Sequence, residues 1–130
     1  MSLANVNRIR AARARPAEMR ATLTAALGTV PGLTASPSIP DQATAGAAWV
    51  KWIQTTYTGN LETPGIYSYD AFLVLPAEYM AETVDQGDDF LAAVVPALWP
   101  LAVVEYAEPV AIQFNDRQTM PGLRLRIVSR

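Results

Sequence analysis

The chain has 130 residues, no cysteine, no histidine and a formal net charge of −2 at pH 7. This length fits a single domain, and the 51% apolar fraction favours a packed core over disorder. The missing cysteine excludes disulfides and thiolate sites, and the missing histidine removes the commonest general base and metal ligand. No apolar run approaches the roughly 20 residues of a membrane-spanning helix, and no signal peptide is recognisable, so we expect synthesis in a cytoplasm and no membrane contact.

Charge is sorted along the sequence. Residues 1–20 carry a net +4 and residues 117–130 another +4, whereas residues 52–116 hold ten acids and no base. Such blocks are neutralised when the ends of a chain pack on its own middle, or when copies in a ring pack against each other. Both arrangements are open. We expect residues 1–15 to form a basic arm or helix, and residues 16–130 to form one α+β domain.

The first clear element is a helix over residues 16–27. Pro16 suits the first helical position, an acid lies in the first turn, and Gly28 suits a C-terminal cap. One residue in four along this helix is large and apolar, which predicts one buried stripe. The stripe consists of Met19, Leu23 and Leu27.

Strands are expected next. Residues 33–39 contain prolines that suit a short edge strand. Residues 47–57 and 66–75 are rich in aromatic and β-branched types and predict a hairpin. Alternation places Trp49 on one face and Trp52 on the other, with further apolar groups on both faces. Both faces of this strand are therefore expected to be covered, by a helix or by a neighbouring subunit.

A second helix is predicted with an N-cap at Thr83 and an end near Val95, before Pro96. Residues 85–89 (DQGDD) include three acids that suit the first turns of this helix. They also suggest a divalent-cation site, but they lack the ligand pattern of a calcium loop. We therefore expect them to stabilise the helix and to hold no metal.

The C-terminal part predicts two further strands. Residues 101–114 are strand material with a break near Pro109, residues 115–122 are a loop with a Pro-Gly turn, and residues 123–128 are the last strand. The order of elements predicts an α+β fold, with two main helices packed on a mostly antiparallel sheet of about four to five strands.

The last strand alternates apolar and cationic side chains. Leu123, Leu125 and Ile127 fall on one face, and Arg124 and Arg126 on the other. We expect the apolar face to pack on the helices. The two arginines are expected to pair with carboxylates from the acidic middle of the chain, in the same subunit or in the next one.

Residues with catalytic potential are few. Glu105 and Glu108 form a conceivable acid/base pair, but on a strand they point to opposite faces, so a solvated or interfacial role is favoured. No phosphate loop, nucleophile elbow or metal-spaced motif is recognisable. We expect no enzymatic activity and no cofactor. The residues predicted to lie at subunit contacts are Arg8, Arg10, Arg13, Trp49, Trp52, Glu105, Glu108, Arg124 and Arg126.

Three short motifs resemble a known family. The first helix ends in L-x-x-V-P-G-L (residues 27–33), I-P-D-Q follows at residues 39–42, and P-G-L-R-L-R-I occupies residues 121–127. With the order of elements, these resemble the tail-terminator (tail-completion) proteins of long-tailed, non-contractile bacteriophages. The resemblance implies a structural virion protein without catalytic residues.

The same resemblance implies the surroundings of the protein. In that family a hexameric ring of small α+β subunits caps the tail tube at the upper end of the tail and joins it to the head-tail connector protein. Genomic DNA passes through the channel without sequence-specific binding. The expected partners are therefore other copies of the chain, the tail tube protein and the connector.

Other classes stay open. One is a different neck protein, either a head-tail connector or a minor tail protein, and another is a small DNA-binding module that uses the basic N-terminal arm. The least supported is an enzyme that uses Asp88, Asp89 or Glu105.

Overall fold

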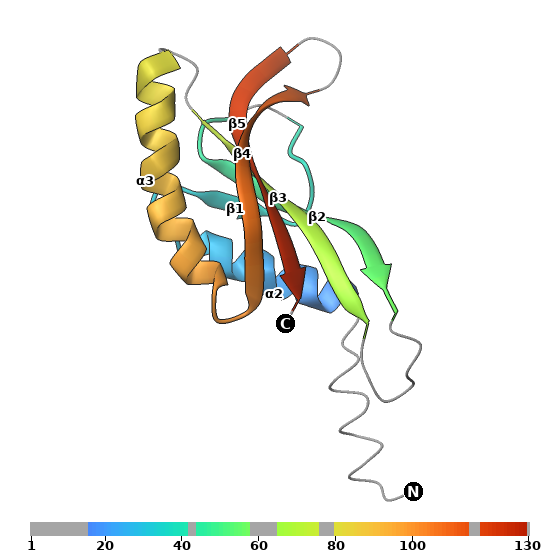
Figure 1. Ribbon diagram of the computed structural model, residues 1–130. Coiled ribbons are helices and arrows are strands. Elements are labelled where there is room, and N and C mark those ends of the chain that lie inside the picture. Colours follow the sequence, from blue (N-terminus) through green and yellow to red (C-terminus); the bar gives the residue numbers. More distant parts are fainter. Residues whose placement is uncertain (1–15, 42–43, 58–64, 76–79, 115–117, 130) are drawn as a thin grey trace, which may run out of the picture.

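The computed structural model describes residues 16–41, 44–57, 65–75, 80–114 and 118–129. These residues form two helices and one five-stranded mixed sheet with the strand order β1-β2-β3-β5-β4 (Figure 1). The predicted α+β class is confirmed. The predicted basic arm, residues 1–15, lies outside the described residues.

The first helix, α2 (Pro16–Gly28), has the predicted bounds within one residue. Its Leu23 and Leu27 are fully buried. The hydroxyl of Tyr69 donates a hydrogen bond of 3.0 Å to the carbonyl of Pro16, which ties the start of the helix to the sheet. The short edge strand, β1 (Thr34–Ser36), follows and pairs in parallel with the beginning of the next strand.

The predicted hairpin is confirmed as β2 (Ala47–Thr56) and β3 (Ile66–Val74), which pair antiparallel. The register shifts between Trp52 and Gln54, so the alternation of β2 changes there. The first four residues of β2 are buried, whereas Lys51 to Gln54 are exposed. Within one subunit, no described helix covers the second half of this strand, so cover by a neighbouring subunit stays a prediction there.

The second helix, α3 (Met80–Leu98), is longer than predicted at both ends. Thr83 lies inside the helix, because the residues before it are good helix formers and extend it backwards. Pro96 lies inside it as well. A proline so close to the end removes one backbone donor, yet the amide of Trp99 still donates to the carbonyl of Val95 at 2.9 Å.

The C-terminal hairpin consists of β4 (Ala102–Phe114) and β5 (Gln118–Ser129). The predicted break at Pro109 is absent, since β4 is the outermost strand and an edge tolerates a residue that lacks an N–H. The predicted Pro-Gly turn is also wrong, because Pro121 and Gly122 lie within β5. The carbonyl of Pro121 accepts a 2.9 Å hydrogen bond from the amide of Leu75.

Gly122 explains why this Pro-Gly pair lies in a strand. A Cβ at this position would lie 2.5 Å from the carbonyl oxygen of Leu73 and 2.2 Å from the Cδ1 of Ile112. Only glycine lets the neighbouring backbone and the Ile112 side chain approach this closely. The glycine therefore serves close packing within the sheet, and the chain continues without a turn.

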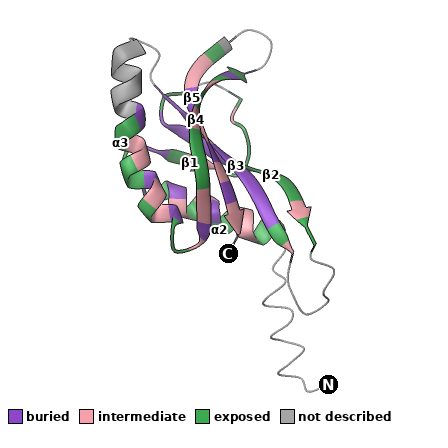
Figure 2. Cartoon of the chain, viewed as in Figure 1, coloured by how far each residue is buried: buried purple, intermediate pink, exposed green. Residues whose placement is uncertain are grey.

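The main core contains side chains from both helices and from one face of the sheet. Leu123, Leu125 and Ile127 are buried in it, so the predicted alternation of the last strand is confirmed. Figure 2 shows the buried segments concentrated in the central strands and on the inner sides of the helices. The buried members of this cluster are Leu23, Leu27, Val30, Leu33, Ala48, Val50, Tyr67, Tyr69, Ala71, Leu73, Leu75, Val94, Leu98, Ala102, Leu123, Leu125 and Ile127.

Candidate interaction surface

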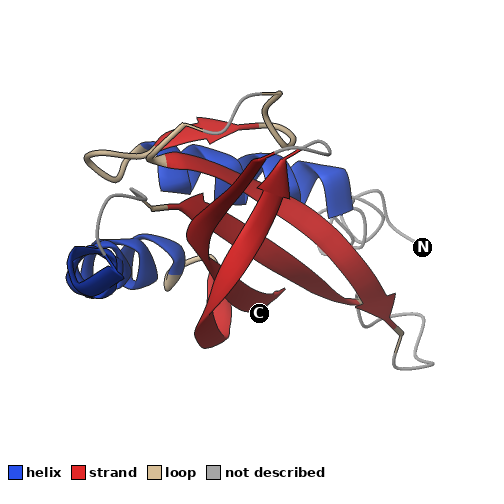
Figure 3. Ribbon diagram, turned by 90° about the horizontal axis from the view of Figure 1, so that it is seen from above, coloured by secondary structure: helices blue, strands red, loops and turns tan. Residues whose placement is uncertain are grey.

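The second face of the sheet differs from the helix-covered face, and no described helix covers it. We call it the open face. The sheet curls, as the view from above shows (Figure 3). Trp49 of β2 and Phe114 of β4 make an edge-to-face ring contact with centroids 5.6 Å apart, although two strands separate β2 from β4. The curl therefore brings the two sides of the open face together at one end.

Cross-strand pairing arranges the open face in rows. One row runs from Lys51 through Asp70 and Arg126 to Tyr106, with one residue from each of β2, β3, β5 and β4. Residues that are directly opposite in antiparallel strands point to the same face and lie close enough to interact. The next row contains Trp49, Phe72, Arg124 and Glu108.

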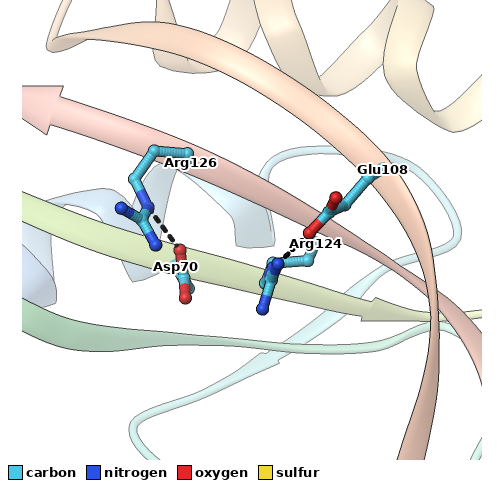
Figure 4. A network of polar contacts seen from close by, with 4 residues as sticks. All are labelled: Asp70, Glu108, Arg124 and Arg126. Carbon is cyan, nitrogen blue, oxygen red and sulfur yellow. Dashed lines mark hydrogen bonds and ion pairs between the residues drawn. The ribbon is translucent and has the colours of Figure 1, made fainter.

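Asp70 and Arg126 form the more buried of two ion pairs in these rows (Figure 4). The Nε of Arg126 donates a 2.7 Å hydrogen bond to Asp70, whose side chain is only 6% exposed. This hydrogen bond is the main cause that raises the pKa of Arg126 above its ordinary value, while burial acts in the opposite direction. The guanidinium also lies 5.9 Å from the ring centroid of Tyr106. Asp70 thus occupies the middle of an apolar strand because a cation neutralises it.

Arg124 and Glu108 form the second pair, also shown in Figure 4. Both side chains are more than one third exposed, so water screens this pair more than the first. Within the described part of the chain, the Nε of Arg124 is buried and has no hydrogen-bond partner. The prediction that both arginines pair with acids from the middle of the chain is confirmed, and both pairs form within one subunit.

Aromatic side chains form the apolar part of the open face. Trp49 stacks on Phe72 with ring centroids 5.5 Å apart, and Phe114 packs against its edge. Ile112 and Val74 complete this small second cluster. Only a few residues are fully buried here, so this cluster is much smaller than the main core.

A cavity of about 550 Å³ opens beside these aromatic rings. Its apolar wall includes Trp49, Phe72 and Ile112, and it lies between β2, β4 and the segment after β1. Three cationic residues also line it, namely Arg20, Lys51 and Arg124. No carboxylate is among the described residues that line the cavity. The cavity is therefore apolar with a cationic border.

Exposed apolar side chains gather at the far end of the first hairpin. We call residues 52–57 and 65–66 the hairpin end. Trp52 is 47% exposed, Tyr57 79% and Ile66 40%, and Ile53 is exposed as well. In Figure 1 this end of β2 and β3 projects beyond the two helices. Exposed apolar groups that cluster in this way mark surfaces that bind other molecules.

The sheet also has free edges on both sides. β1 pairs only with residues 47–49 of β2, so among the described strands residues 50–56 of β2 have no outer partner. β4 forms the opposite edge over its whole length. Free edges present unpaired backbone groups and are templates for pairing with another chain.

The predicted contact residues fall into different places. Trp49 is buried within the subunit, Trp52 lies on the hairpin end, and Glu105 is exposed on the β4 edge beside a register shift. Glu108, Arg124 and Arg126 are in the ion pairs of the open face. Arg8, Arg10 and Arg13 lie outside the described residues.

Asp70, Lys51 and the cavity were not predicted as contact features from the sequence. For Asp70 a signal exists, because a lone carboxylate in the middle of the apolar strand 66–75 indicates an internal cation beside it. The cavity had no such signal, because the curl of the sheet forms it from distant segments.

A scan against models of known protein families finds no match to this chain, and neither does a search of curated proteins. Neither described helix combines the length and the hydropathy that crossing a bilayer requires. The interpretation of the interaction surface therefore depends on its geometry and chemistry.

Proposed function

We propose that the chain is a structural, non-enzymatic virion subunit that assembles with copies of itself into a closed ring, of the kind that terminates a phage tail tube. The ring caps the tube at the upper end of the tail, contacts the tube protein on one side and the head-tail connector on the other, and lets DNA pass through its channel. The α+β layer with two helices packed on one face supplies a compact subunit for such a ring.

The observation that carries the proposal is the presence of two different surfaces on one subunit, the hairpin end and the cavity. The hairpin end exposes apolar side chains at the projecting end of β2 and β3, and the cavity lies between β2, β4 and the segment after β1. A contact between two different surfaces is head-to-tail, and such contacts generate rings when the rotation closes.

Charge supports the same arrangement at the edges. Lys51 is exposed on the β2 edge, and Glu105 is exposed on the β4 edge. The two edges therefore differ in charge, which favours contacts between unlike surfaces over contacts between like ones. The ion pairs of Arg124 and Arg126 form within one subunit, so they stabilise the subunit and are not evidence for contact with a second copy.

Tube length is the readout that tests the proposal. The protein is added to a polymerising phage tail tube protein, and tube lengths are measured by electron microscopy. A terminator stops elongation, and a ring with rotational symmetry appears at one end of each tube. Tubes of unchanged length with no cap would overturn the proposal.

Matched variants make this test specific. Ile53→Glu places a charge on the hairpin end and should abolish capping, because a buried contact does not accept an unpaired carboxylate. Ala25→Glu adds the same charge to an exposed position of α2 and should cap normally. In a virion, loss of a terminator gives overlong tails, whereas loss of another neck protein gives tails of normal length that lack heads.

A further inference from the structure

The cavity on the open face has the chemistry of a binding site for a specific kind of segment. Its wall is aromatic and aliphatic, and its border carries Arg20, Lys51 and Arg124 from three different elements. A volume of about 550 Å³ lies in the range of sites that hold a small ligand or a few side chains. Apolar walls with a cationic border favour an apolar group that has a carboxylate beside it.

The protein itself contains a segment with this chemistry. The hairpin end exposes Tyr57 and Ile66, and the residues that connect them in the sequence include Leu61 and Glu62. Glu62 is the only charged residue between positions 57 and 66. The hairpin end and its connection thus combine aromatic, aliphatic and anionic groups.

The described residues of the hairpin end lie away from the cavity of the same chain. Lys51 lines the cavity, whereas Tyr57 lies six residues further along the chain, just past the end of β2, which corresponds to about 20 Å of extended chain. The second half of β2 runs out to the projecting end (Figure 1). A second copy of the chain is therefore the source of the occupant that this geometry favours.

We infer that the cavity of each subunit receives the hairpin end of the next copy, with residues 57–66 against the aromatic wall and Glu62 near Lys51 and Arg20. This inference rests on the proposed head-to-tail ring and names the contact that forms it. The buried, unpartnered Nε of Arg124 is a further donor at the border of the cavity. Insertion of the hairpin end covers the exposed apolar side chains and fills the cavity in one step.

Binding of a synthetic peptide of residues 57–66 to the full chain tests the inference. The variant Trp52→Phe/Trp99→Phe keeps Trp49, which lines the cavity, as the only tryptophan. We expect a saturable change in the emission of Trp49. The Glu62→Gln peptide, or the Lys51→Gln protein, should bind about fivefold more weakly, as for the loss of one ion pair. Added salt should weaken the unmodified pair.

Three results would overturn the inference. They are no saturable response up to millimolar peptide, equal binding of a scrambled peptide, and an affinity unchanged by both charge removals. The outcome is separable from that of the proposed function. Rings that form without peptide binding would reject the inferred contact and leave the proposed ring standing. Peptide binding without any capping of tubes would reject the proposed function and leave the contact between copies standing.

Discussion

The two faces of the sheet use the same strands for different purposes. Among the described residues, the helix-covered face contributes to a cluster of 17 buried apolar residues drawn from both helices and from β2, β3, β4 and β5. The apolar cluster of the open face contains five buried residues of the described chain, and this face also carries two ion pairs and a cavity. Because apolar burial dominates folding energy, the first face specifies the fold and the second is free to carry contacts.

This difference gives each alternating residue of β5 a separate task. Leu125 is fully buried among the helices, while Arg126 beside it neutralises a carboxylate on the other face. A substitution on one face should therefore affect mainly stability, and a substitution at the hairpin end mainly assembly. Substitutions in the core, in the ion pairs, at Tyr69 and at the hairpin end test this separation.

Leu125→Ala should cost about 2–5 kcal/mol of unfolding free energy, because it leaves a cavity in the closed core. Ile112→Ala on the open face should cost less, about 2 kcal/mol at the lower end of that range, since Ile112 already borders a cavity. Chemical denaturation monitored by circular dichroism measures both values. Equal losses would show that the two faces contribute alike and would remove the contrast.

Arg126→Met should cost about 2–4 kcal/mol, because Asp70 is left nearly buried without its cation. Arg124→Met should cost no more than about 1 kcal/mol, because its pair with Glu108 is more exposed. The double variant Asp70→Asn/Arg126→Met should recover part of the first loss. The denaturant midpoints of these variants give the comparison when the unfolding free energy depends on denaturant concentration with the same slope. A larger loss for Arg124→Met than for Arg126→Met would contradict the expectation that the Asp70–Arg126 pair contributes more stability.

Tyr69→Phe should cost about 1 kcal/mol at neutral pH, since it removes the hydrogen bond to Pro16. Burial is the main cause that raises the pKa of Tyr69 to about 12. The Tyr69 hydroxyl ionises near pH 10 in the unfolded chain but only near pH 12 in the folded chain. Its contribution to stability is therefore constant below pH 10 and is lost progressively from pH 10 to pH 12. Between pH 8 and pH 11 the free energy of unfolding of Tyr69→Phe should therefore fall less than that of the unmodified protein, as measured by chemical denaturation at both pH values. An identical fall in both proteins would contradict a contribution from Tyr69 ionisation.

Ile53→Glu should change the free energy of unfolding by no more than about 0.5 kcal/mol, because Ile53 is exposed at the register shift of β2. The same variant is expected to lose assembly, so stability and function separate at this position. Thermal unfolding beside a sedimentation measurement tests both. A large loss of stability would place the hairpin end in the core of the fold instead.

Sequence patterns predicted the elements that follow simple periods. The helix at residues 16–27, the hairpin and the alternation of Leu125 with Arg126 all depend on local spacing, which the sequence displays directly. Prolines at three positions wrongly predicted the end of an element, because the cost of a proline depends on its surroundings. Pro96 is tolerated near the end of α3, Pro109 on the edge strand β4, and Pro121 next to the close contact at Gly122.

The candidate surface was only partly predictable. Trp52 and Glu105 are exposed on opposite sides of the sheet, and their residue types alone suggested a contact role. The cavity depends on the curl that brings β4 towards β2, and no local pattern encodes a contact between such distant strands. For the same reason Lys51 could be recognised as a border residue only in three dimensions.

A contact between the hairpin end of one copy and the cavity of the next is testable by cross-linking. Since the chain has no cysteine, Tyr57→Cys and Gln113→Cys can be prepared as separate proteins, mixed at high concentration and oxidised. Tyr57 lies on the hairpin end and Gln113 lines the cavity. The account predicts disulfide dimers that contain one copy of each variant, identified by mass. Dimers of like variants alone, or none, would contradict it.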